Sequence, residues 1–185
     1  MVEKILEIQS EDHLESMLRT NGVPLDEWDS FKGISDLWKE IKSGETQMVQ
    51  EGKEVVRQVG VVRIHVFYEK GRVKLKLIEE KQVRNDGEER VRGFDYVAEK
   101  QKKGEDPNRA GARGVQEELG IFVNPRSLSS LGAKTEERDS PSYPGLKSRY
   151  KTYNFELHLE DSQFNPDGYV EEDEKKRTFF KWIPA

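Results

Sequence analysis

Four charged residues stand at spacings that would let them act together: Glu105, Arg113, Glu117 and Glu118. Residues three and four apart share one face of a helix, so positions 114, 117 and 118 are expected side by side near the end of a helical segment. Carboxylate oxygens are the ligands that Mg²⁺ prefers, and a bound metal neutralises phosphate charge and activates water. The segment therefore predicts a site for Mg²⁺ or Mn²⁺, with Glu117, Glu118 and Glu105 as its ligands.

The same segment resembles the signature of the Nudix hydrolases, written G-x5-E-x7-R-E-U-x-E-E-x-G-U, where U is a bulky aliphatic residue. By spacing, the matching residues are Glu105, Arg113, Val115, Glu117, Glu118, Gly120 and Ile121. The match is strong over residues 104–121 and weaker outside them. The resemblance implies a hydrolase of nucleoside-diphosphate-linked compounds, in which Glu118 and Arg113 have catalytic roles.

Two positions depart from this signature. Glu99 stands where the signature opens with glycine, and Gly114 stands where a glutamate follows the arginine. Gly114 removes one ligand or base and weakens a helix by about 1 kcal/mol relative to alanine. Arg113 loses the carboxylate that it orients in the family, although it can still pair with Glu117 one turn further on. The alternative is therefore a non-catalytic binding or regulatory module that keeps the fold and has lost the site.

An acidic run near the end of the chain, residues 171–174, is a second source of carboxylates. In the family an acidic residue from a late loop often supplies a further ligand or the base. Within this run, Glu172 is the expected substitute for the missing helical carboxylate. The alternative is a mobile, charged surface loop.

A Pro- and Gly-containing loop over residues 139–149 contains the candidate substrate-binding residues Tyr143, Lys147 and Arg149. An aromatic ring can stack on a base, and cationic side chains can hold phosphate. Equally, the tyrosine can pin the loop to the core. The segment Ser142–Leu146, together with the N-terminal part, is also similar to uncharacterised Nudix-like proteins of plants and algae, which adds no known activity.

The strands and the helix that must position these residues are predicted from the period of the apolar residues and from turn-forming and helix-capping residues. Apolar residues alternate with period two from Val55 onward, which indicates strands, and Asn85-Asp86-Gly87 predicts a hairpin turn. Asp106-Pro107 predicts the start of a helix that ends at Leu119, before Gly120. Later strands are expected over residues 131–137, 149–159 and 178–183. This order predicts an α+β fold, a Nudix-like mixed-sheet α/β/α sandwich.

The first 50 residues are predicted to form a helical extension, and residues 51–185 the Nudix-like domain. Ser10 and Ser35 are the expected helix caps, and Asn21-Gly22 and Ser43-Gly44 the expected helix ends. Residues 50–54 are expected to be a charged linker between the two parts. The extension is also a candidate surface for a homodimer.

Composition and charge exclude several kinds of site and partner. The chain has 185 residues, no cysteine and a net charge of −5, which excludes disulfides, thiol catalysis and zinc–thiolate sites. Acidic and basic residues are interspersed without a basic stripe, so nucleic acid is not expected as a partner. No apolar run approaches the roughly 20 residues of a membrane span, so no membrane association is expected. A cytoplasmic protein with a phosphorylated small-molecule ligand is the expectation.

Overall fold

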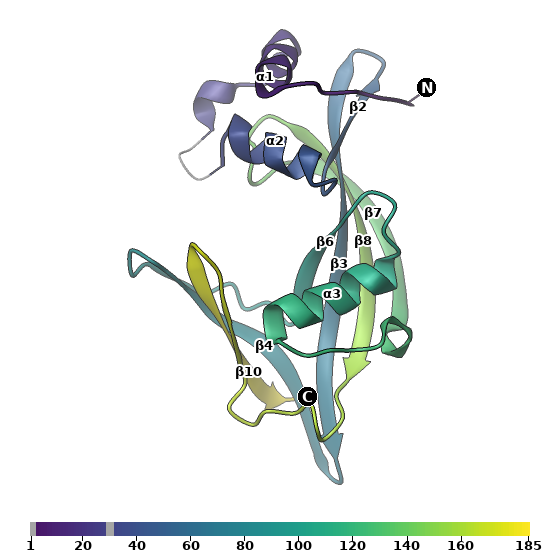
Figure 1. Cartoon of the computed structure of the whole chain (residues 1–185), viewed down its shortest axis with the longest axis vertical. Coiled ribbons are helices and arrows are strands. Elements are labelled where there is room, and N and C mark those ends of the chain that lie inside the picture. Colours follow the sequence, from purple (N-terminus) through teal and green to yellow (C-terminus); the bar gives the residue numbers. More distant parts are fainter. Residues whose placement is uncertain (1–2, 29–31) are drawn as a thin grey trace. The chain divides into compact units, whose positions relative to one another are not determined.

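The computed structural model describes residues 3–28 and 32–185 and divides into two compact units (Figure 1). The first unit comprises Met1–Val61, Lys100–Glu105 and Ala133–Thr152. The second comprises Val62–Glu99, Asp106–Gly132 and Tyr153–Ala185. The first unit contains segments from both predicted domains, residues 1–50 and 51–185. The division into those two domains stays a prediction.

Helices and short strands from the N-terminal part build most of the first unit. Its elements are β1 (Glu3–Ile5), α1 (Glu11–Thr20), η1 (Leu25–Glu27), α2 (Ile34–Lys42), β2 (Gln47–Glu51) and the start of β3 (Glu54–Lys70). Strand β2 pairs antiparallel with both β1 and β3. The Ser10 hydroxyl accepts a hydrogen bond from the His13 backbone N–H at 3.1 Å, which confirms the predicted cap of α1.

Two local predictions in this unit are wrong. Helix α2 begins at Ile34 and Gly33 is its N-cap, so Ser35 lies inside the helix and does not cap it. The Asp36 carboxylate accepts from the Gly33 backbone N–H at 3.0 Å, so a side chain inside the first turn satisfies a donor at the start of the helix. Residues 50–54 are a hairpin between β2 and β3, with Gly52 at φ +62°, and not a linker. Their polar composition reflects an exposed turn.

The core of the first unit gathers around α1 and α2, and its largest buried side chains include Leu14, Leu37, Met48 and Tyr143. A buried carboxylate, Glu40, lies beside this core. Its oxygens are 2.7 Å from Arg57 Nη2, 2.6 Å from Lys32 Nζ and 2.7 Å from Lys100 Nζ. Burial by itself would raise the pKa of Glu40, but the charges of Lys100 and Arg57 outweigh it and hold that pKa well below its usual range.

Strands dominate the second unit. Strand β4 (Val73–Arg84) pairs antiparallel with β3, with β5 (Glu89–Arg90) and with β10 (Lys176–Pro184), which also pairs with β9 (Tyr169–Glu172). The predicted hairpin at residues 85–87 is confirmed between β4 and β5, with Gly87 at φ +86°. Strands β6 (Val97–Gln101), β7 (Ser129–Asp139) and β8 (Lys147–His158) contribute residues to both units. The three predicted late strands are confirmed: β7 and β10 extend beyond the predicted bounds at both ends, and β8 begins earlier and ends one residue before the predicted end, whereas β9 was not predicted.

Helix α3 (Pro107–Leu119) carries the signature segment and packs on β3 of the second unit (Figure 1). The Asp106 carboxylate accepts from the backbone N–H groups of the second and third helical residues, at 3.0 and 3.3 Å. The helix ends at Leu119, and Gly120 has φ +68°. Both predicted boundaries are therefore confirmed. Val115 belongs to the buried core that also contains Val62 and Ile64, and η2 (Pro125–Ser127) follows the helix.

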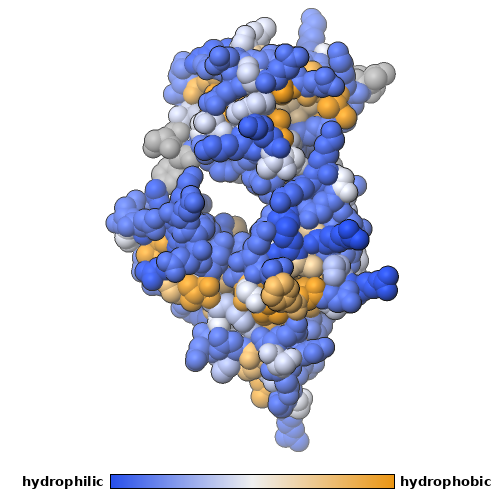
Figure 2. All heavy atoms as spheres, in the orientation of Figure 1, coloured by the Kyte–Doolittle hydropathy of each residue, from blue (hydrophilic) through white to orange (hydrophobic). Residues whose placement is uncertain are grey.

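The fold is α+β, with antiparallel strand pairs and helices packed on the sheet, which confirms the predicted class. Hydrophilic residues cover much of the face in Figure 2, as expected of a chain that is 36% charged. No helix in the described part of the chain has the length and apolar character needed to cross a membrane.

Candidate active site

Glu118, near the end of α3, lies half-buried among charged side chains from several strands of the second unit. The residues that act on it electrostatically are Glu171 of β9, Lys176 of β10, Glu99 of β6 and Glu79 of β4. Burial, followed by the negative charge of Glu171, raises the pKa of Glu118 to about 8, although Lys176 opposes the shift. Glu118 is therefore largely protonated at neutral pH.

The carboxylates around Glu118 each have a cationic partner. Glu79 is only 3% exposed and accepts from Arg92 Nε at 2.7 Å, with a second, parallel contact from Arg92 Nη2. Glu171 lies 3.4 Å from Lys176 Nζ. Burial is therefore the first cause of the raised pKa of Glu118, and the charges of Glu171, Glu99 and Glu79 add to it against the opposing charge of Lys176.

Arg113 joins the helix to β6. Its Nη1 atom lies 3.1 Å from Glu99 Oε1 and 3.3 Å from Glu117 Oε2, so the pair expected from the helical spacing is present. The Glu117 side chain is 53% exposed, whereas Glu118 is half-buried. The two adjacent glutamates therefore point in different directions, and only Glu118 joins the cluster.

Gly114 lies on the buried face of α3, and the side chain of Glu99 occupies the space beside it. A Cβ atom added to Gly114 would lie 2.6 Å from Cβ and 3.2 Å from Cγ of Glu99. Real Cβ atoms do not approach other atoms so closely, so a side chain at position 114 requires the strand to move. The glycine inside this helix thus has a packing reason.

The role predicted for Glu172 as the late carboxylate stays a prediction, and the structure brings its neighbour Glu171 close enough to act on Glu118. Along β9, Tyr169 and Glu171 are half-buried, while Val170 and Glu172 are exposed, as the two-residue period of a strand requires. Glu171 is the residue whose charge acts on Glu118. Of the acidic run, the first residue, Glu171, is the one on the half-buried face of β9. The alternation along the strand, which cannot be read from four consecutive acidic residues, decides which residue takes that face.

The predicted substrate-binding residues Tyr143, Lys147 and Arg149 all belong to the first unit. Tyr143 is 0% exposed, and its ring centroid is 4.9 Å from that of Trp28. A ring buried in this way cannot stack on a ligand, so the alternative, in which the tyrosine pins its loop to the core, describes the structure.

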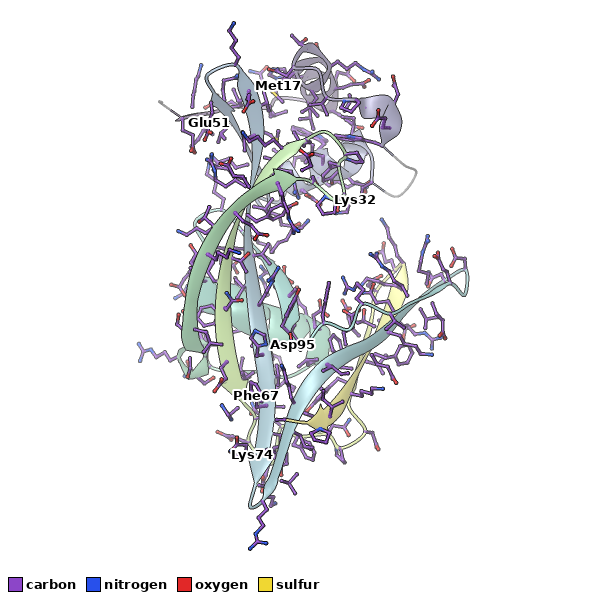
Figure 3. All side chains as sticks on the ribbon, turned by 180° about the vertical axis from the view of Figure 1, so that it is seen from behind. Met17, Lys32, Glu51, Phe67, Lys74 and Asp95 are labelled. Atoms are coloured by element: carbon purple, nitrogen blue, oxygen red, sulfur yellow. The ribbon has the colours of Figure 1, made fainter. Side chains whose placement is uncertain are left out.

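The two cations of that loop are engaged in ion pairs within the first unit. Lys147 Nζ is 2.9 Å from Glu54, and Arg149 Nη1 is 2.6 Å from Glu51, which is labelled in Figure 3. Arg149 also pairs with Glu3 at 3.1 Å. These contacts hold the β2–β3 hairpin and β8 together, and no phosphate role follows from them.

The three predicted metal ligands belong to different units, with Glu117 and Glu118 in the second. Glu105 belongs to the first unit, where its carboxylate accepts from the Lys102 backbone N–H at 2.9 Å, and its role as a ligand stays a prediction. Within the described residues, no group of three or more His, Cys, Asp or Glu side chains is placed to hold a metal ion. The donors around Glu118 nevertheless fit a hard cation in their chemistry, because they are carboxylate oxygens.

Comparisons with known proteins give structural similarities only. No family model and no curated protein matches the sequence. A MutT/nudix family protein from Enterococcus faecalis is similar at a TM-score of 0.49 and 11% identity, over 96% of this chain and 57% of that one. The C. elegans Ap4A hydrolase binary complex is similar at a TM-score of 0.39 and 14% identity, over 68% of this chain and 80% of that one.

The E. coli dihydroneopterin triphosphate pyrophosphohydrolase is similar at a TM-score of 0.41 and 19% identity, over 68% of this chain and 80% of that one. All three TM-scores lie below 0.5, so these similarities carry no functional argument for this chain.

Proposed function

We propose that this chain is a Mg²⁺- or Mn²⁺-dependent hydrolase of nucleoside-diphosphate-linked compounds, with Glu118 at the centre of the site. The observation that carries the proposal is the half-buried Glu118 carboxyl, whose pKa is raised to about 8 in a negatively charged cluster. Perturbed carboxylates in such surroundings are typical of functional sites. Binding a cation would release the proton of Glu118 and relieve the repulsion from Glu171.

The side chains of the second unit divide the remaining tasks. Glu118 and Glu171 would hold the cation, which when bound supplies charge neutralisation for the diphosphate and an activated water. Lys176, on β10 beside Glu171, would attract the phosphate. Arg113 would orient the carboxylates that it contacts on β6 and α3.

A surface of the second unit supports the nucleoside part of the proposal. The rings of Phe94 and Tyr96 are stacked with centroids 5.0 Å apart, next to Asp95, which Figure 3 labels. The Arg92 guanidinium lies 4.5 Å from the Phe94 centroid and that of Arg63 lies 4.8 Å from the Tyr96 centroid. Arg92 also contacts Glu79, whose charge acts on Glu118, so this surface and the carboxylate cluster share a residue.

The first experiment is a calorimetric titration of the metal-free protein with Mg²⁺ and with Mn²⁺. The wild type is expected to bind saturably, and Glu118→Gln to lose that binding. Glu117→Gln is the matched control, because its side chain is the exposed neighbour. A screen for hydrolysis of the diphosphate bond in nucleoside-diphosphate-linked compounds, read as release of the nucleoside monophosphate, would follow. If the wild type took up no metal to millimolar concentration and released no nucleoside monophosphate, the hydrolase proposal would be wrong.

A second candidate function is a binding or regulatory module without catalysis. The observation in its favour is the absence of a preformed three-ligand metal group among the described residues. The two functions differ in their dependence on Glu118. A binding module would retain its affinity for ADP in Glu118→Gln and lose it in Tyr96→Leu. Phe179→Leu is the control, because Phe179 has similar cationic neighbours, Lys81 and Arg177, elsewhere in the unit.

A further inference from the structure

We infer that Glu99 has taken the place of the helical carboxylate that Gly114 lacks, and that it holds the divalent cation together with Glu118. The inference rests on the proposed function and assigns one more residue to the same site. In the signature, position 99 is a glycine and position 114 a glutamate, whereas this chain has the reverse. The exchange leaves the number of carboxylates unchanged and moves one of them from α3 to β6.

The two exchanged positions are in contact, which is the first reason to regard them as linked. The space that a side chain at position 114 would need is filled by Cβ and Cγ of Glu99, at 2.6 and 3.2 Å. Two glutamates could not be accommodated there without moving β6 away from α3. A glycine at 114 is therefore what permits a glutamate at 99, and loss of the helical carboxylate coincides with its replacement from the facing strand.

Arg113 supplies the second reason. By the resemblance, this arginine orients the carboxylate that follows it in sequence, which here is missing. Its guanidinium instead lies 3.1 Å from Glu99 Oε1, and both side chains are largely shielded, at 21% and 17% exposure. The arginine thus keeps a carboxylate partner, contributed by the strand. A charge-assisted pair of this kind holds the carboxylate in one orientation.

The third reason is position. Glu99 packs against Gly114, which lies one helical turn before Glu118 on the same face of α3. These two carboxylates come from different elements, and Glu171 comes from a third, β9. Ligands on separate rigid elements can surround a cation, whereas Glu117 and Glu118, adjacent on one helix, point in different directions.

The test is a swap of the two residues. Four proteins are compared: the wild type, Glu99→Gly, Gly114→Glu, and the double variant that restores the signature. Calorimetry with Mn²⁺ alone measures affinity, and thermal unfolding with circular dichroism measures folding. Glu99→Gly is expected to weaken Mn²⁺ binding by about 10-fold to 100-fold. Gly114→Glu alone is expected to lower the melting temperature, because its Cβ meets Glu99.

The double variant is expected to recover both the melting temperature and, to within a few-fold, the affinity for Mn²⁺. Glu99→Gln keeps the packing against Gly114 and removes only the charge, so it should weaken Mn²⁺ binding to a similar extent while remaining folded. This isosteric variant keeps the test decisive if Glu99→Gly fails to fold. Unchanged Mn²⁺ affinity in Glu99→Gln, or a folded double variant that binds no Mn²⁺, would overturn the inference.

Failure of the inference and failure of the proposed function give different results. If Mn²⁺ binding depends on Glu99 but no nucleoside-diphosphate-linked compound is hydrolysed, the metal assignment holds and the hydrolase proposal is wrong. If hydrolysis is lost in Glu118→Gln and retained in Glu99→Gln, the hydrolase proposal holds and Glu99 is only a packing residue. A wild type without affinity for Mn²⁺ contradicts both.

Discussion

Two shielded carboxylates, the buried Glu40 in the first unit and the half-buried Glu118 in the second, have opposite surroundings. Glu40 is contacted by Lys32, Lys100 and Arg57, and its pKa is held well below the usual range. Glu118 lies among other carboxylates, and its pKa is raised to about 8. A buried charge that is fully paired stabilises a particular fold. A shielded carboxylate that lies near other carboxylates destabilises the fold when it is ionised, and a bound cation can offset that cost.

The largest effect is expected from removing the paired charge. Glu40→Gln should destabilise the first unit by about 3–5 kcal/mol, because it leaves a buried cation without its counter-ion. That cation is Arg57, whose side chain is 4% exposed. Urea unfolding measures the change. Glu45→Gln is the control, because Glu45 pairs with Lys100 at 3.1 Å and is more exposed. Equal stabilities for the two variants would show that the Glu40 cluster is not a structural centre.

Replacing Glu118 should change the free energy of unfolding in the opposite direction. Without metal, Glu118→Gln is expected to stabilise the protein at pH 8 by on the order of 2 kcal/mol. The folded pKa of about 8 exceeds the ordinary value of 4.5, so the folded state binds more protons and the wild type loses stability as pH rises between these values. Thermal unfolding at pH 5 and pH 8 in a chelator measures the difference. A variant that gained nothing at pH 8 relative to pH 5 would mean that Glu118 is ionised without strain.

Acid should remove the stabilisation that Glu40 contributes. The folded pKa of Glu40 lies below the ordinary 4.5, so its contribution is present above that value and is lost as pH falls toward the folded pKa. Wild-type stability should therefore fall below about pH 4.5, and Glu40→Gln should flatten that limb relative to Glu45→Gln. Urea midpoints at pH 5, 4 and 3 provide the measurement. An acid limb of the same slope in both variants would contradict the expected role of Glu40.

The sequence predicted those parts of the site that are determined locally. Asp106 and Gly120 mark the ends of α3 because a cap and a positive φ depend on neighbouring residues alone. The pair of Arg113 with Glu117 likewise follows from helical spacing. For the same reason, the α+β class was predictable from periodicity.

What could not be predicted depends on contacts between distant segments. The approach of Glu99 to Gly114 joins a strand to a helix, and spacing along the chain contains no information about it. The choice of Glu171 over Glu172 depends on the register of β9 against β10, and the burial of Tyr143 on packing against Trp28. The sequence did contain one signal of this contact: Glu99 replaces a glycine of the signature, and Gly114 replaces a glutamate.

The smallest effect is expected from Glu117, and it sharpens the contrast with Glu118 most directly. Glu117→Gln removes a charge next in sequence to Glu118, from a side chain that is 53% exposed and 3.3 Å from Arg113. Its cost in stability should be a few tenths of a kcal/mol, as for other surface substitutions, and Mn²⁺ affinity should not change. Thermal unfolding and calorimetry on this variant check both expectations. A large loss of Mn²⁺ binding would mean that the exposed glutamate turns inward when the cation arrives, and the site would then be built along α3, as the sequence first suggested, and not across from β6.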